Sequence, residues 1–297
     1  MKILIHIGYP KAWSKFIQKH LFMNANINYL NVSRSNFYID YLKFRDFMKF
    51  SSDDEFNKNI SFYRNKLEKY FDINKTNLYS DEFFLCPNPN GYKMIFRLIK
   101  FFSYNSNQID FIIFTRKQSD LFNSYYAQNY EEFIDLNPMY KDYKNIVNFF
   151  KSEKSSLKDK NFFKIWNLTK VKNLIKRLNH KLPVIINCED LQNKDENSYK
   201  ELSNIFNLSL TMIYQIFNEK KFHSSVKSLD QLQIKNLTRI VIKYPITRYF
   251  LRYFSMDFKL YIKSLFSIFF NKKFITIKPE NNKLIDDYYK NVKKKIK

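Results

Sequence analysis

Short apolar runs alternate along the chain with longer stretches that have helical spacing. The runs at Ile3–Ile7, Ile109–Thr115 and Pro183–Asn187 are continuous, and Asn77–Ser80 is a shorter strand candidate. A continuous apolar run bounded by turn residues is typical of a strand that is covered on both faces. The pattern therefore predicts an α/β fold in which helices flank both faces of a mostly parallel sheet.

The segments between these strands have the apolar spacing of amphipathic helices. One helix is predicted at Ser14–Asn24, directly after the first strand. Helical insertions are predicted at about residues 36–75 and 135–180, and the C-terminal region is mainly helical. Because no repeat or low-complexity linker interrupts the alternation, we predict a single domain over residues 1–297.

A further helix is predicted at Ser119–Phe133, after the strand Ile109–Thr115. Its N-cap is predicted to be Ser119, and Asp120 falls in the first turn, where negative charge is favoured. In open parallel sheets, ligands bind beyond the carboxyl ends of the strands. We therefore expect the functional loops at residues 8–15, 81–86, 116–119 and 188–193.

The formal net charge of +23 suits anionic partners such as nucleotides, nucleic acid, acidic glycans or lipid surfaces. A lysine-rich solvated surface explains much of the same charge. The sequence contains no recognisable nucleic-acid-binding module, so we expect no nucleic-acid partner. The aromatic stretch Ile246–Phe270 is interrupted by charges and predicts a helix packed on the core. A membrane-surface helix is its alternative, so we expect at most peripheral membrane contact.

The two cysteines, Cys86 and Cys188, lie far apart in the sequence. They form no disulfide framework and no metal-ligand spacing, so we expect no metal and a reducing compartment. The N-terminal segment lacks the apolar core and cleavage site of a signal peptide. These features together predict a cytoplasmic protein.

The first loop, Gly8–Lys15, has the chemistry of an anion site. Backbone N–H groups of such a turn can surround an anion, Lys11 adds a full positive charge, and Ser14 can donate a hydroxyl hydrogen bond. The loop is not a Walker A loop, because Trp13 takes the place of the second glycine of GxxxxGK[ST]. A surface lysine beside a turn is the alternative interpretation of this segment taken alone.

The segment PKAWSKFIQ, Pro10–Gln18, resembles the 5′-phosphosulfate loop of sulfotransferases that use 3′-phosphoadenosine-5′-phosphosulfate (PAPS). That loop is usually P-K-[ST]-G-[ST]-T or, in bacterial members, P-K-A-[GA]-S-T followed by an aromatic residue and Leu-Gln. Two positions depart from the pattern, since Trp13 replaces a small residue and Lys15 replaces a hydroxyl residue. The resemblance implies that PAPS is bound here by Lys11, Ala12, Trp13, Ser14 and Lys15.

The same family has a 3′-phosphate motif at the end of a central strand, with an Arg at the strand tip and a Ser eight positions on. Arg116 and Ser124 meet this spacing. The resemblance implies that both bind the 3′-phosphate, and a guanidinium can bind phosphate through two parallel hydrogen bonds. Taken singly, Arg116 is better explained by a structural ion pair and Ser124 by a solvent-facing helix position.

The segment Asn77–Glu82 resembles the region where many carbohydrate sulfotransferases have a catalytic carboxylate. The resemblance implies that Glu82 is the general base that accepts the proton of the acceptor hydroxyl. An acid favoured by a helix N-terminus is the alternative interpretation. Later segments, Asn187–Leu191 and Ile285–Asn291, also resemble parts of the family, so the resemblance covers nearly the whole chain.

The resemblance implies a three-layer α/β fold like that of P-loop NTPases, with PAPS as the co-substrate, Lys11 as a catalytic residue and no metal. The expected acceptor is a hydroxyl group, on a sugar of a glycan or glycolipid. Two alternatives stay open. One is a non-catalytic relative that binds nucleotide or glycan, and the other is a nucleotide-dependent kinase of related fold.

Overall fold

The computed structural model describes residues 1–9, 12–30, 36–85, 92–104, 108–128, 167–219, 231–233, 274–276 and 279–291. The chain divides into two compact units. The first contains residues 1–116 and 155–222, and the second contains residues 117–154 and 223–297. The predictions for Cys86, Ile246–Phe270 and residues 135–166 fall outside the described residues.

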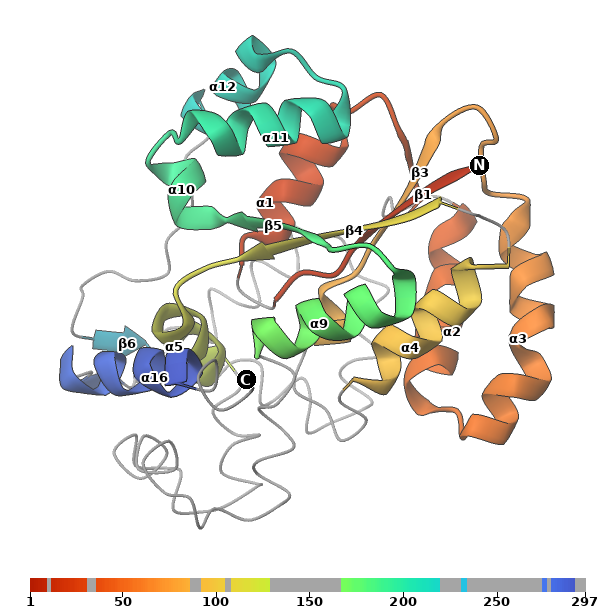
Figure 1. Cartoon of the computed structure of the whole chain (residues 1–297), viewed down its shortest axis with the longest axis horizontal. Coiled ribbons are helices and arrows are strands. Elements are labelled where there is room, and N and C mark those ends of the chain that lie inside the picture. Colours follow the sequence, from red (N-terminus) through yellow and green to blue (C-terminus); the bar gives the residue numbers. More distant parts are fainter. Residues whose placement is uncertain are drawn as a thin grey trace, which may run out of the picture. The chain divides into compact units, whose positions relative to one another are not determined.

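A five-stranded sheet, parallel throughout, lies at the centre of the first unit (Figure 1). The strands are β1 (Lys2–His6), β2 (Asn28–Tyr29), β3 (Thr76–Ser80), β4 (Gln108–Thr115) and β5 (Val184–Asn187). Their order in the sheet is β2-β3-β1-β4-β5, so β1 lies in the middle, between β3 and β4. The four strands predicted from the sequence are confirmed, whereas the two-residue strand β2 was not predicted.

Helices cover both faces of this sheet (Figure 1). One face carries α1 (Ser14–Phe16), its π-helical continuation η1 (Ile17–Phe22), α11 (Glu196–Phe206) and α12 (Leu210–Glu219). The other face carries α2 (Asn36–Phe50), α4 (Lys93–Phe102) and α9 (Leu168–Asn179), with α3 (Asp53–Glu68) packed on α2. The predicted α/β fold, a parallel sheet flanked by helices, is confirmed.

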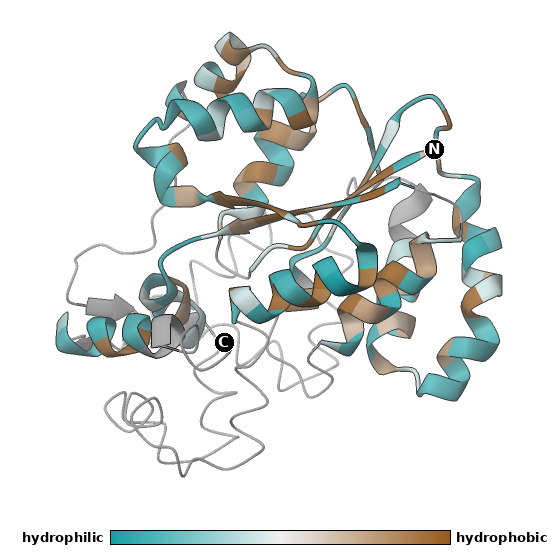
Figure 2. Ribbon diagram, in the orientation of Figure 1, coloured by the Kyte–Doolittle hydropathy of each residue, from teal (hydrophilic) through white to brown (hydrophobic). Residues whose placement is uncertain are grey.

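Burial explains why the strands could be predicted from the sequence. In β1, Ile3 and Ile5 are completely buried, and in β4 the run from Phe111 to Phe114 is buried as well. The strands are accordingly mostly hydrophobic in Figure 2, while the helices of this unit combine hydrophobic and hydrophilic residues. Helix α4 shows this well, because Leu98 is buried whereas Phe96 is half exposed.

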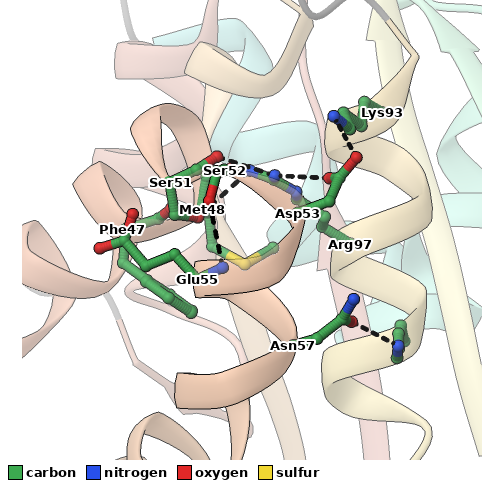
Figure 3. A network of polar contacts seen from close by, with 10 residues as sticks. Phe47, Met48, Ser51, Ser52, Asp53, Glu55, Asn57, Lys93 and Arg97 are labelled. Carbon is green, nitrogen blue, oxygen red and sulfur yellow. Dashed lines mark hydrogen bonds and ion pairs between the residues drawn. The ribbon is translucent and has the colours of Figure 1, made fainter.

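The buried Arg97 of α4 joins three helices of the first unit (Figure 3). Its Nη1 donates to the carbonyl of Met48 at 2.7 Å and its Nη2 to the carbonyl of Ser51 at 2.9 Å. Nη2 also forms an ion pair of 2.9 Å with Asp53, and the guanidinium carbon lies 4.9 Å from the ring centroid of Phe56. One side chain therefore anchors the turn between α2 and α3 to α4.

The second unit contains α5 (Gln118–Gln128), a two-stranded antiparallel sheet of β6 (Gln231–Gln233) and β7 (Phe274–Thr276), and α16 (Pro279–Asn291). The prediction that Ser119 caps α5 is wrong, because the helix begins at Gln118 and Ser119 lies inside it. Its N–H and its hydroxyl instead donate to the carboxylate of Asp286 in α16, at 2.9 and 3.1 Å. A distant carboxylate thus supplies the acceptor that the local sequence was expected to provide.

Across the described ranges, no helix combines the length and apolar character that a membrane crossing requires.

Candidate functional site

The carboxyl edge of the sheet collects the segments in which the sequence predicted function. Strand β1 lies beside both β3 and β4, and β5 lies beside β4, so the residues that follow these strands leave from adjacent positions. The chain after β1 continues into α1 on one face, whereas the chain after β3 continues to α4 on the other face (Figure 1). Such a divergence is where open α/β sheets form a ligand-binding crevice.

The loop after β1 has a strained backbone at Trp13. This residue has φ 58° and ψ 18°, which is the left-handed conformation. A side chain makes that conformation unfavourable by roughly 1–2 kcal/mol, so glycine is its usual occupant. The N–H of Ala12 donates to the carbonyl of Tyr9 at 3.1 Å, and the N–H of Ile17 donates to the carbonyl of Trp13 at 3.0 Å. These two hydrogen bonds fix the backbone before and after Trp13.

Gly8 leaves room for two polar side chains at the start of this loop. A Cβ on residue 8 would lie 2.8 Å from Nε2 of His6 and 3.0 Å from Oγ of Ser14. Both side chains are almost fully buried, and within the described ranges neither atom has a hydrogen-bond partner. Buried polar atoms are normally paired, so two orphan atoms beside one glycine mark a place where a ligand or water oxygen is expected.

His6 is held in place by a small polar cluster. Its Nδ1 shares a hydrogen bond of 2.7 Å with Oγ of Ser80, to which Gln18 also donates at 3.0 Å. The rings of Phe22 and Phe114 pack edge-on against the imidazole. Burial lowers the pKa of His6 to about 3, so the ring is neutral near pH 7. A neutral imidazole can contribute a hydrogen bond to a ligand, but no charge.

Two adjacent acids follow β3 and lie in different surroundings. Asp81 is buried, its N–H donates to the carbonyl of His6 at 2.9 Å, and its carboxylate accepts a 2.8 Å hydrogen bond from Tyr41. Burial, followed by the nearby Asp81 charge, raises the pKa of Tyr41, which therefore stays a hydrogen-bond donor. Glu82 is only half-buried and opens the 3₁₀-helix η2 (Glu82–Leu85). Asp81 is thus bonded to β1 and α2, whereas Glu82 is partly exposed at the sheet edge.

The ends of β4 and β5 carry an ion pair. Nε of Arg116, the residue after β4, lies 3.8 Å from Oε1 of Glu189. Glu189 is the second residue of α10 (Cys188–Gln192), which follows β5 directly. The predicted loop at 188–193 is therefore mostly helix. The buried thiol of Cys188 donates to the carbonyl of Ala12 at 3.6 Å, which links this helix to the loop after β1.

The remaining predicted residues are less informative. Lys15 is exposed in α1, and Lys11 lies outside the described residues. Ser124 lies half-buried in α5, in the second unit, so its pairing with Arg116 stays a prediction. Within the described segments, no group of three or more His, Cys, Asp or Glu side chains could hold a metal ion.

Sequence reasoning missed two features of this edge. It did not predict that His6 would pair with Ser80, and it did not predict that Glu189 would pair with Arg116. The strand register contains both signals, because His6 is aligned with Ser80 and Thr115 with Asn187. Comparison with protein-family models finds no match, and comparison with curated proteins finds no significant match.

Proposed function

We propose that this protein is a PAPS-dependent sulfotransferase that acts on a hydroxyl acceptor. The observation that carries the proposal is the left-handed backbone at Trp13. Trp13 stands where the phosphosulfate loop of the family has glycine or another small residue. A tryptophan that keeps the backbone conformation preferred by glycine supports a loop of the same shape, since strain of this kind concentrates at functional sites.

The polar atoms beside Gly8 support the proposal a second way. The buried hydroxyl of Ser14, which has no partner among the described residues, is suited to donate to an oxygen of the phosphosulfate group. Nε2 of His6 offers a further hydrogen bond from a neutral ring. The donor set therefore fits an oxyanion, and the sulfotransferase fold related to P-loop NTPases is part of the same proposal.

The roles of the other residues follow from direct, in-line displacement. The acceptor oxygen bonds to sulfur while the bond between sulfur and the phosphate oxygen breaks, leaving adenosine 3′,5′-bisphosphate. Lys11 stabilises the negative charge that develops on the leaving phosphate, and Glu82 accepts the proton of the acceptor hydroxyl. Arg116 and Ser124 bind the 3′-phosphate. Positioning and electrostatic stabilisation supply the catalysis, as in phosphoryl transfer.

The proposal covers an enzyme of the cytoplasm whose acceptor is a sugar of a glycan or glycolipid. It is tested by PAPS turnover with a panel of glycans, using the wild type and two variants. We expect Lys11→Ala to nearly abolish transfer. Glu82→Gln should retain PAPS binding but lower transfer by about two to four orders of magnitude, because only the basicity is lost.

One result of these experiments would favour the non-catalytic alternative. Trp13 is much larger than the residue it replaces, and a wild type that binds no nucleotide would mean that the indole blocks the loop. In that case the double variant Trp13→Gly, Lys15→Thr should gain nucleotide binding that the wild type lacks. Such a gain, without turnover in the wild type, would contradict the proposed activity.

A further inference from the structure

Two buried polar atoms face the same position beside Gly8. A Cβ on this residue would lie 2.8 Å from Nε2 of His6 and 3.0 Å from Oγ of Ser14. The two residues are 0% and 2% exposed, and within the described residues neither atom has a hydrogen-bond partner. Buried polar atoms are normally paired, so an atom that bonds to both is expected between them. Its chemistry depends on whether Nε2 carries a proton.

The other ring nitrogen of His6 indicates where the proton lies. Burial lowers the pKa of His6 to about 3, so near pH 7 the ring is neutral and has one N–H. Nδ1 lies 2.7 Å from Oγ of Ser80. When a hydroxyl donates to Nδ1, that nitrogen is the acceptor and the N–H is on Nε2. The tautomer of His6 therefore depends on the direction of the hydrogen bond to Ser80.

The other partners of Ser80 favour donation to His6. Gln18 donates to Oγ of Ser80 at 3.0 Å, and a hydroxyl that accepts a hydrogen bond becomes a better donor. Tyr29 also forms a side-chain hydrogen bond with Ser80, and burial raises the pKa of Tyr29, so its phenol keeps its proton. Between the two rings, imidazole nitrogen is the stronger acceptor and phenol the stronger donor. The Ser80 proton is therefore directed to Nδ1.

We propose that Ser80 is a positioning residue that fixes the proton of His6 on Nε2, and that Nε2 and the Ser14 hydroxyl together donate to one unprotonated oxygen of a phosphate or sulfate group. This inference rests on the proposed function, in which the loop after β1 binds the phosphosulfate group. Two donors accept an oxyanion oxygen and offer no acceptor to an ammonium group. Gly8 is part of the arrangement, since a Cβ at this position would crowd both donors.

Two amide variants separate the two nitrogens of His6. The amide of asparagine reaches about as far as Nδ1, and that of glutamine about as far as Nε2. His6→Asn can therefore keep the contact with Ser80, but only His6→Gln keeps a donor beside Gly8. Calorimetric titration with adenosine 3′,5′-bisphosphate should show about 10-fold weaker binding by His6→Asn, the loss of one hydrogen bond to a charged group. The affinity of His6→Gln should stay within about threefold of the wild type.

Nitrogen-15 NMR of the full-length wild type tests the tautomer directly. His6 is recognised as the ring that stays neutral on acidification to about pH 5, and its signals should be missing in His6→Gln. We expect the proton on Nε2, and a shift of the Nε2 signal on addition of sodium sulfate. A proton on Nδ1 would overturn the inference. An Nε2 signal that neither sulfate nor phosphate moves would overturn it too, and would leave the position to an ordered water.

Sulfate and phosphate distinguish a donor from an acceptor at Nε2. Near neutral pH sulfate carries no proton, whereas inorganic phosphate carries at least one. If Nε2 and Ser14 both donate, sulfate should move the Nε2 signal at least as far as phosphate does at the same concentration. A signal that responds to phosphate alone would mean that Nε2 accepts a proton from the ligand, which contradicts the proposed tautomer.

Variants of Ser80 test its positioning role. Ser80→Ala removes the donor to Nδ1, so the Nδ1 signal of His6 should move and the affinity for the bisphosphate should fall about three- to tenfold. Ser80→Thr keeps the hydroxyl and should restore both. Ser51→Ala is the matched control, because it removes another buried serine hydroxyl of the first unit, one that donates to the carbonyl of Phe47. Equal losses of affinity in Ser80→Ala and Ser51→Ala would overturn the positioning role.

The failure of this inference is distinguishable from the failure of the proposed function. If the wild type binds the bisphosphate and neither His6→Asn nor Ser80→Ala weakens that binding, only this inference is overturned. If the wild type binds no bisphosphate but sulfate still moves the Nε2 signal of His6, the proposed function is overturned and the pair of donors stands.

Discussion

Two regions of the first unit bury polar groups in opposite ways. Around Arg97, the carbonyls of Met48 and Ser51 and the carboxylate of Asp53 accept its terminal N–H groups, and Nε is the one buried N–H of this guanidinium without a partner among the described residues. Around Gly8, the buried atoms Nε2 of His6 and Oγ of Ser14 have no hydrogen-bond partner in the described part of the chain. Paired buried groups hold the fold together, whereas unpaired ones point to a ligand.

The two regions differ in backbone strain as well. The Arg97 network joins ordinary helices, and Ser52, which caps α3, has the extended backbone usual for an N-cap. The loop after β1 instead holds Trp13 in the left-handed region. Strain is tolerated where the surrounding structure fixes the residue, and it recurs at binding sites. Together, the strain and the unpaired atoms support the proposal that the loop after β1 binds a ligand.

The largest expected effect comes from acidification and involves His6. Its pKa is about 3 in the folded protein and 6.5 in the unfolded chain, so the unfolded state binds more protons between these values. The titration of His6 leaves the free energy of unfolding unchanged above about pH 6.5. Below that value it lowers the free energy of unfolding by about 1.4 kcal/mol per pH unit, down to about pH 3. Urea unfolding at several pH values should show a shallower acid slope for His6→Gln. Equal slopes would contradict the neutral, buried imidazole.

The next effect concerns the paired region. Arg97→Met removes the donors of two buried carbonyls, so we expect the free energy of unfolding to fall by about 3 kcal/mol. Asp53→Asn is the control, because the Asp53 side chain is 57% exposed and should tolerate the change with little loss of stability. Urea unfolding of both variants measures the difference. Similar losses in the two would mean that the ion pair, and not the carbonyl bonds, stabilises the network.

A smaller effect is expected when a methyl group is added at Gly8. In Gly8→Ala the new methyl group meets Nε2 of His6 at 2.8 Å and Oγ of Ser14 at 3.0 Å. The overpacking should lower the free energy of unfolding by about 1–3 kcal/mol. Removing the serine hydroxyl in the double variant Gly8→Ala, Ser14→Ala should recover part of that loss. If Gly8→Ala is as stable as the wild type, the space beside Gly8 is larger than the contacts indicate.

The smallest effect isolates the strain at Trp13. Trp13→Gly and Trp13→Ala both lose the indole, but only glycine adopts the left-handed conformation without strain. We expect Trp13→Gly to be more stable than Trp13→Ala by about 1 kcal/mol. Thermal unfolding of the pair measures this difference. The reverse order would show that the loop does not require that conformation.

Much of the fold could be predicted from the sequence, because its strands are apolar and continuous. Ile109–Thr115 was predicted to be a buried strand, and the structure confirms it, because β4 spans Gln108–Thr115. Features that depend on tertiary contacts could not be predicted. The π-helix at Ile17–Phe22 has no local signal, and Ser119 looked like a cap because the sequence does not reveal that Asp286 accepts its N–H.

Residues of the candidate site could be predicted only where they belong to a sequence motif. Ser14 and Arg116 were predicted from motif position, and the structure adds that Ser14 is buried and that Arg116 pairs with Glu189. His6 pairs with Ser80 of β3, and Glu189 pairs with the residue that follows β4, so both contacts depend on strand register, which no single segment encodes. The glycine-like backbone at Trp13 was equally hidden, since a tryptophan at that position gives no sign of a left-handed conformation.

We propose that the loop after β1 and the end of β4 belong to one site for a nucleotide with a 3′-phosphate. The most direct test is calorimetry with adenosine 3′,5′-bisphosphate, AMP and ATP with Mg²⁺ on the wild-type protein. The loss of a charged, bidentate contact makes AMP bind about 10- to 100-fold more weakly than the bisphosphate, which corresponds to roughly 1.5–3 kcal/mol. Equal affinity for the bisphosphate and AMP, or a preference for ATP with Mg²⁺, would contradict the claim.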